Sequence, residues 1–188
     1  ALDLGTPSTA SSSASEVKSM SYLAKANYNY KSKYYLTASF RADGSSKLSK
    51  NNRWGYFPSA SIAWNFARED FMKKVKWFNN GKLRFSWGMT GNNRVSDFAS
   101  YSKVYSGRSS EYSFGDAFYP GYLLGSLGNE NLKWETTTQI NLGLDLGFFN
   151  DRIVFTFDSY IKNTDDLLLY ADIPTTTGFS NVYKNIGK

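Results

Sequence analysis

The side chains that most often perform acid–base or metal chemistry are scarce in this sequence. None of its 188 residues is His or Cys, which removes Cys–His and Ser–His–Asp catalysis and the usual zinc sites. The adjacent carboxylates Asp165 and Asp166 suggest paired acids or a calcium ligand. Neither EF-hand spacing nor a nucleophile–base arrangement surrounds them, so we expect a solvated loop start there. We therefore expect no enzyme, no cofactor and no metal site.

Aromatic side chains offer a different chemistry, which is binding. The segment of residues 91–132 is rich in Tyr and Phe. Such rings stack on sugar rings or anchor a partner protein, although a long loop that packs on its own side chains is the favoured interpretation. If the chain contacts a ligand or a partner, we expect the contacts at Tyr105, Tyr112, Phe114, Phe118, Tyr119 and Tyr122.

The charge pattern argues against nucleic-acid binding. The formal net charge is +6, and a basic balance suits nucleic acid or an anionic membrane surface. The Lys and Arg residues are scattered singly, however, with no basic run longer than MKKVK. We interpret this charge as solvated surface and expect no nucleic-acid partner.

Alternation of apolar and polar residues is the strongest structural signal. In RWGYFPSASIAWNF, residues 53–66, the even positions are almost wholly apolar and the odd positions are mostly small or polar. This period of two is typical of half-buried strands, and the abundance of Tyr, Phe and Thr favours an all-β protein. Pro58 cannot donate to a ladder, which predicts a bulge or local break. The six expected strands span residues 18–30, 34–42, 53–66, 81–91, 133–148 and 152–162, with room for more within 98–106 and after Leu167.

Tight and long connections alternate along the chain. The tight ones are residues 31–33 and 149–151, and the long ones are residues 43–52, 91–132 and those after 163. Asp43-Gly44 is a dipeptide that favours positive φ, which predicts an ordinary loop turn; the alternative is a loop that contacts a ligand or a partner protein. The intermediate connection, 67–80, has apolar residues at helical spacing, which predicts one or two helical turns.

Two architectures explain such strands. A soluble β-sandwich buries the apolar face in protein, and alternation alone favours it. A transmembrane barrel turns the same face to lipid, and three features favour it: runs of 11–16 alternating residues against the ~5–6 of globular strands, alternating connections, and aromatic residues at strand ends. Ten residues at about 3.3 Å, tilted by about 40°, rise roughly 25 Å, which matches an apolar membrane band. The expected membrane-interface residues are Trp54, Tyr56, Trp64 and Phe66.

The opposite face of the strands is polar. In a barrel it lines the lumen, where Asp145 and Asp158 are a second choice for contact with a transported molecule.

The number of strands sets the scale of the barrel. The smallest single-chain outer-membrane barrels have about eight strands, so either residues 91–132 hide a hairpin or the chain is an arc of a larger barrel. The first residues show no signal-peptide pattern, which favours the arc. We interpret residues 1–16 as a flexible Ser/Thr-rich loop or an artificial end, and residues 17–188 as the barrel part.

Several motifs occur together in the order that one known family shows. They include YNYKSKYYLTASFRADGSSK, NNRWGYFPSASIAW, KLRFSWGMTGN and TTTGFSNVYKNIGK. On these residues the sequence resembles the barrel of SusC/RagA-type TonB-dependent outer-membrane transporters, over nearly all of residues 17–188. The family motif falls on residues 41–46, 53–59 and 185–187.

The resemblance implies an antiparallel transmembrane β-barrel of about 22 strands around an N-terminal plug. This chain would supply about six to eight of those strands and long extracellular loops. The implied function is import of glycans or peptides across the outer membrane of a Gram-negative, Bacteroidota-like bacterium. The implied partners are outer-membrane lipid, the rest of the barrel and plug, TonB through an N-terminal part not recognisable here, a SusD-like surface lipoprotein as a lid, and the cargo. The alternative is a soluble or surface β-sandwich that binds carbohydrate.

Overall fold

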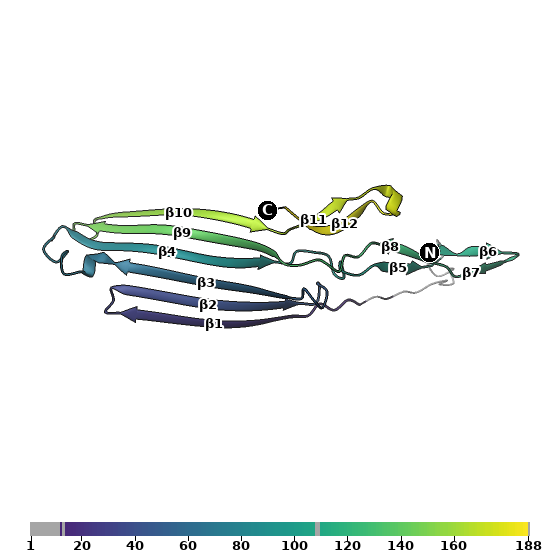
Figure 1. The fold of residues 1–188 in the computed structure, drawn as a ribbon, viewed down its shortest axis with the longest axis horizontal. Helices are drawn as coiled ribbons and strands as arrows, with labels where there is room; N and C mark the ends of the chain where they lie inside the picture. The colour runs from purple at the N-terminus through teal and green to yellow at the C-terminus, as the bar shows by residue number, and fades with distance from the viewer. Residues whose placement is uncertain (1–11, 13, 108–109, 188) are drawn as a thin grey trace, which may run out of the picture.

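The chain folds into one long antiparallel sheet with three small hairpins beyond one end (Figure 1). The computed structural model describes residues 12, 14–107 and 110–187. The six strands of the sheet stand in the order β1-β2-β3-β4-β9-β10. Their bounds are Ser19–Tyr30, Tyr34–Ser45, Trp54–Asn65, Phe78–Asn92, Glu135–Phe148 and Ile153–Asp165. The six strands predicted from alternation are therefore confirmed, with ends that differ by a few residues.

The remaining strands form the hairpins. Strand β5, Lys103–Ser106, pairs with β8, Tyr122–Ser126. Between them β6, Tyr112–Phe114, pairs with β7, Ala117–Tyr119. We call this double hairpin, residues 103–107 and 110–126, the arm. Strand β11, Leu167–Asp172, pairs with β12, Asn181–Ile186. Residues 91–132 do contain a hairpin, one of the two alternatives left open by the strand count, but it projects beyond the sheet and adds no strand to it (Figure 1).

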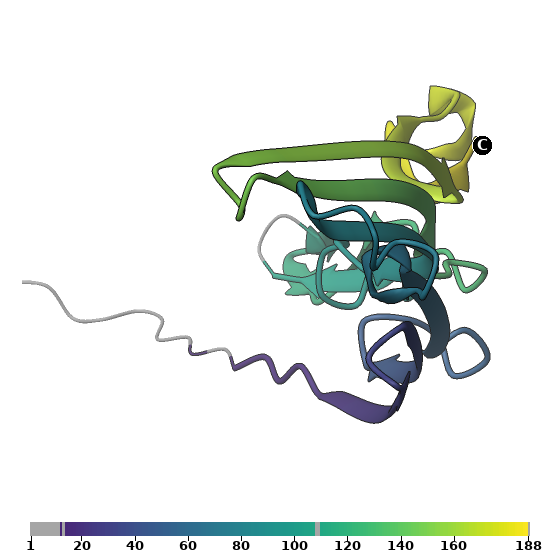
Figure 2. The same ribbon diagram turned by 90° about the vertical axis from the view of Figure 1, so that its left-hand side faces the viewer.

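The sheet is a single, open layer. Seen along its strands, it forms one curved ribbon (Figure 2). Trp64, Ile140 and Phe155, from three strands of the apolar face, are 36%, 42% and 50% exposed. No second layer of described residues covers that face. The alternative of a soluble β-sandwich is therefore wrong.

The strand register aligns like side chains across the sheet. One row of paired residues on the apolar face reads Tyr30, Tyr34, Trp64, Leu83, Leu144 and Phe157. A row nearer the middle reads Ala26, Ala38, Ala60, Trp87, Ile140 and Ile161. A slip of one residue would turn a whole strand over, so the alternation in the sequence specifies this register.

Pro58 marks a break on one side of β3 only. Toward β2 the pairing continues through Pro58 without a shift, so no bulge forms. Toward β4 the pairing stops at Ser59, next to the proline that has no N–H to donate. Phe57, 6% exposed, lies across this gap with its ring against Gly55 of β3 and Gly91 of β4. The predicted local break is thus confirmed on the β4 side.

The prediction of a turn at Asp43-Gly44 is wrong. Both residues continue β2, where Asp43 pairs with Ser21 of β1 and Gly55 of β3. A Cβ at position 44 would lie 3.1 Å from the Trp54 indole. The glycine therefore makes room for a neighbouring ring instead of supplying a positive φ.

The predictions for the other connections are largely confirmed. Residues 31–33 and 149–151 form tight turns. In the first turn φ is positive at Lys31 and Ser32, and in the second it is positive at all three residues, 149–151. After β3 the chain forms a 3-10 helix, η2, over Phe66–Arg68, followed by successive turns. The predicted helical turns are therefore present in 3-10 form, without an α-helix.

The buried core lies at the end of the sheet where the hairpins begin. Leu48 and Leu132 are fully buried and pack with Val95 and Ala99. The partly buried side chains packed against them are Trp134, Leu168 and Tyr183. We call these seven residues the loop base. They join the connections that follow β2 and β4, the segment before β9, and the β11–β12 hairpin.

Candidate functional site

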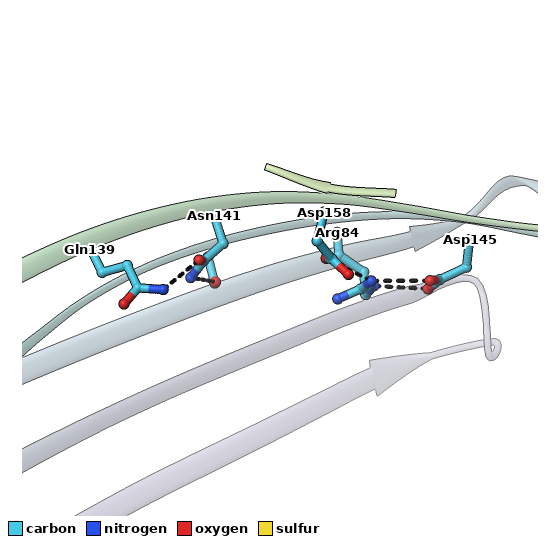
Figure 3. Close-up of polar contacts among 6 residues, drawn as sticks. Arg84, Gln139, Asn141, Asp145 and Asp158 are labelled. Atoms are coloured by element: carbon cyan, nitrogen blue, oxygen red, sulfur yellow. Dashed lines mark hydrogen bonds and ion pairs between the residues drawn. The ribbon is translucent and has the colours of Figure 1, made fainter. Parts of the chain in front are cut away.

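The polar face of the sheet carries hydrogen bonds between side chains, both across neighbouring strands and within β9. Ser39 Oγ on β2 lies 2.7 Å from Ser59 Oγ on β3. Asn141 Nδ2 donates to Ser86 Oγ at 3.0 Å, and Gln139 Nε2 donates to Asn141 Oδ1 at 2.6 Å (Figure 3). Such a face suits contact with water or a hydrated solute.

Arg84 joins both carboxylates that the sequence analysis placed on this face. Its guanidinium makes a two-point contact with Asp145, with Nε–Oδ2 at 2.8 Å and Nη2–Oδ1 at 3.0 Å. The same Nη2 donates to Asp158 Oδ1 at 3.0 Å (Figure 3). A planar, permanently charged fork is the side chain best suited to two carboxylates. The three residues, on β4, β9 and β10, form one ion cluster across three strands.

Gly143 is what lets this cluster form. It lies between Arg84 and Asp158 in register. A Cβ at position 143 would lie 2.6 Å from Asp158 Oδ1 and 2.7 Å from Arg84 Cζ, so the arginine passes over the bare backbone. The sequence analysis did not single out Arg84 or Gly143. The sequence does show that Arg84 and Gly143 both occupy polar-face positions of their strands. Only the register between β4 and β9 shows that they are neighbours.

The predicted interface residues lie in two groups at opposite ends of the apolar face. Trp54 and Tyr56 each stack on a ring from a neighbouring strand, with centroids 5.8 and 6.0 Å apart. At the other end Trp64 contacts Phe66, with centroids 5.7 Å apart. Small residues such as Ala60 lie between these groups. The contact of the four aromatic residues with lipid stays a prediction.

Glu69, which the sequence analysis missed, binds the indole N–H of Trp64 and the polar ends of two neighbouring side chains. Its carboxylate accepts hydrogen bonds from Lys33 Nζ at 2.7 Å, Tyr34 Oη at 2.8 Å and Trp64 Nε1 at 3.1 Å. These donors, Lys33 foremost, lower the pKa of Glu69 from 4.5 to about 2. Rings with an apolar body and a hydrogen-bonded tip are typical of a membrane interface.

The aromatic residues predicted to contact a ligand or partner all lie in the arm. Phe114 and Phe118 are 77% and 76% exposed. Tyr112 and Tyr119 pair across the small hairpin and stack, with centroids 5.9 Å apart. These six residues do not converge on one point. Their exposure does not fit the interpretation of a loop packed on its own side chains, and their role stays a prediction.

Asp165 and Asp166 form no paired-acid site. Asp165 ends β10, and Asp166 is in an ion pair with Lys133, with Nζ–Oδ2 at 2.9 Å. Among the described residues, no group of three His, Cys, Asp or Glu side chains is placed to hold a metal. Over the same residues no helix is long and apolar enough to cross a membrane.

Long antiparallel strands in a single layer, one apolar face, one polar face and loops gathered at one end define a segment of β-barrel wall. A search against family models gives the same class. The model named "TonB dependent receptor-like, beta-barrel" matches residues 1–188, and the chain belongs to that family.

Relatives of known sequence confirm the resemblance. The TonB-dependent receptor SusC of Bacteroides thetaiotaomicron is 42% identical over 171 residues, which cover 89% of this chain and 17% of SusC. The TonB-dependent receptor P3 of Formosa agariphila is 41% identical over 179 residues, which cover 95% of this chain and 18% of P3. The chain therefore spans less than a fifth of the length of these relatives.

Solved structures confirm the architecture of a partial barrel. The RagAB peptide transporter matches with a TM-score of 0.80 at 30% identity, over 91% of this chain and 18% of that chain. The siderophore receptor PirA from Pseudomonas aeruginosa matches with a TM-score of 0.52 at 17% identity, over 90% of this chain and 29% of that one. The second likeness shows the fold alone.

Proposed function

We propose that the full-length protein imports glycans or peptides across the outer membrane of a Bacteroidota-like bacterium, driven by TonB. This chain contributes part of the barrel wall and outer loops. Its relatives are named TonB-dependent receptors, and RagAB is described as a peptide transporter. The names support the class of function and give no support to an enzyme.

The observation that carries this proposal is the uncovered apolar face between two aromatic groups. Hydrocarbon is the environment in which such a face is stable, and only a closed sheet satisfies its backbone there. The polar face, with its ion cluster and amide network, then lines the lumen. Asp145 and Asp158 are both bonded to Arg84, so their role there is mainly to hold the wall together and less to contact a transported molecule.

The transport proposal is tested by uptake in living cells. Cells with and without the gene, and cells without TonB, are given a mixture of oligosaccharides and tryptic peptides, and depletion of each class from the medium is followed by mass spectrometry. We expect one class to be depleted only when the gene and TonB are both present. Equal depletion by all three strains would contradict import by this protein.

The arm is the proposed contact for a SusD-like surface lipoprotein that closes over the barrel. Phe114 pairs with Ala117 and Phe118 pairs with Ser113, so each phenylalanine is next in sequence to the other's partner and the two face opposite sides of the β6–β7 hairpin. Both sides of the arm therefore carry exposed aromatic surface. In water, an exposed apolar patch of this kind marks a contact with another protein.

Shortening the arm tests this contact. Val104 and Leu124 are paired, so an Asn-Gly turn joining them removes the outer part while the root stays closed. We expect normal amounts of protein in the outer membrane and loss of co-purified surface lipoprotein. The double substitution Phe114→Ser and Phe118→Ser, which keeps the arm's length, is expected to act in the same direction. Unchanged co-purification with both variants would exclude the arm as the contact.

A further inference from the structure

We infer that a cleft between the root of the arm and the β11–β12 hairpin binds a sugar ring of a glycan. The cleft has a volume of about 310 Å³, at the lower end of the roughly 300–1,000 Å³ of small-molecule sites. The lining residues that carry the argument are Lys103, Tyr105, Tyr170, Asn181, Tyr183 and Ser96. The inference rests on the proposed function, since it names one class of cargo and a place where it is held.

One wall of the cleft is a pair of tyrosines on the β11–β12 hairpin. Tyr170 and Tyr183 face each other across the two strands, with ring centroids 4.8 Å apart and a tilt of 46°. Tyr183 is part of the loop base, where it packs against the buried cluster, and its carbonyl accepts a hydrogen bond from Asn129 Nδ2 at 2.9 Å. Tyr183 is thereby fixed, whereas Tyr170 stays exposed and offers its ring to a ligand.

The opposite wall is formed by the root of the arm. The β5–β8 register shifts between Lys103 and Val104, which leaves Gly125 as the extra residue of a bulge. A Cβ at position 125 would lie 1.8 Å from Tyr105 Cε2, so the Tyr105 ring lies directly over this glycine. The bulge and the missing side chain together position the ring of Tyr105 at the cleft.

The chemistry of the lining favours a sugar over a peptide. Aromatic rings pack on the C–H faces of a pyranose, while hydroxyl and amide groups match its hydroxyls. Asn181 is oriented by Asp172, which accepts from its Nδ2, and by Ser180 Oγ, which lies 2.7 Å from its Oδ1. Lys103 is the one charged residue of the lining, and no carboxylate of the described residues lines the cleft. A neutral or anionic polyhydroxyl ligand fits this set, and a basic peptide does not.

Binding to the purified full-length protein in detergent tests the inference. The probes are hexasaccharides of α-1,4-glucose, β-1,4-glucose, β-1,4-xylose and β-1,4-mannose, with a tryptic casein digest as the peptide probe, measured by calorimetry. We expect at least one hexasaccharide to bind. Tyr170→Ala and Tyr105→Ala should each weaken it about tenfold, the scale of one lost aromatic contact. Tyr170→Phe keeps the ring and should stay within about threefold.

Tyr101→Ala is the matched control. Tyr101 is an exposed tyrosine of the same loop region that does not line the cleft, so its loss should leave the affinity unchanged. The inference is overturned if no hexasaccharide binds, if the Tyr101 and Tyr170 variants weaken binding equally, or if only peptide binding responds to Tyr170→Ala. TonB-dependent uptake that continues in any of these cases leaves the proposed function standing. If a hexasaccharide binds as expected but the cells show no TonB-dependent uptake, the proposed import function is contradicted, whereas the inference of a sugar-binding cleft is supported.

Discussion

At the scale of single residues, Gly143 decides whether one arginine can reach across three strands. In Gly143→Ala the new Cβ would lie 2.6 Å from Asp158 Oδ1 and 2.7 Å from Arg84 Cζ, so Arg84 would have to shift and its bond to Asp158 would be lost. Because these side chains are partly exposed, we expect a loss of only about 0.5–1 kcal/mol in the free energy of unfolding. Urea unfolding of the full-length protein in detergent measures it. In an Asp158→Asn background the same change should cost less, because the ion pair with Asp158 is already gone, and an undiminished cost there would refute this explanation.

Glu69 gives a residue-scale prediction that depends on pH. Its pKa falls from 4.5 to about 2 on folding, so its contribution is complete above pH 4.5 and is lost as the pH falls toward 2. Wild type should therefore unfold at higher urea than Glu69→Gln at pH 7, and the difference should shrink from pH 4.5 downward. Glu130→Gln, which removes an exposed carboxylate, is the control. A difference that stays constant down to pH 2.5 would contradict the role of the charge.

At the scale of elements, alternation was enough to predict the six strands and their faces, because one face of each strand meets a uniform environment. The turn preference of a dipeptide was the signal that failed, at Asp43-Gly44, where it yields to pairing on both sides and to the space that Trp54 requires. Local patterns also cannot show which distant segments meet. The contacts of Lys33, Tyr34 and Trp64 with Glu69, and of Tyr170 with Tyr183, depend on register and on packing at the loop base.

At the scale of the whole molecule, the central prediction is that adjacent residues of one strand meet different solvents. Ile62 and Ser61 on β3 lie on opposite faces, and Ile62 pairs with Leu36 and Phe85. In a cysteine-free full-length protein reconstituted into vesicles, a spin label at Ile62→Cys should collide with oxygen in the bilayer. A label at Ser61→Cys should instead collide with a water-soluble nickel reagent. Equal accessibility of both positions to nickel would contradict a membrane-spanning wall.

The joint between β3 and β4 gives this wall a line of weakness. The two strands are bonded from Ser59 to Asn65, whereas β2 holds β3 from Trp54 to Trp64 and β9 holds β4 along its length. The sheet therefore consists of two stiff plates, β1–β3 and β4–β10, that are hinged along half of their shared edge. Near the loops side chains tie the plates together instead of strand pairing: the ring of Phe57, the bond from Trp134 Nε1 to the Arg53 carbonyl at 3.1 Å, and the packing of Leu48 in the loop base. Because strand pairing is missing there, these side-chain contacts set how far one plate can move against the other at the loop end of the wall.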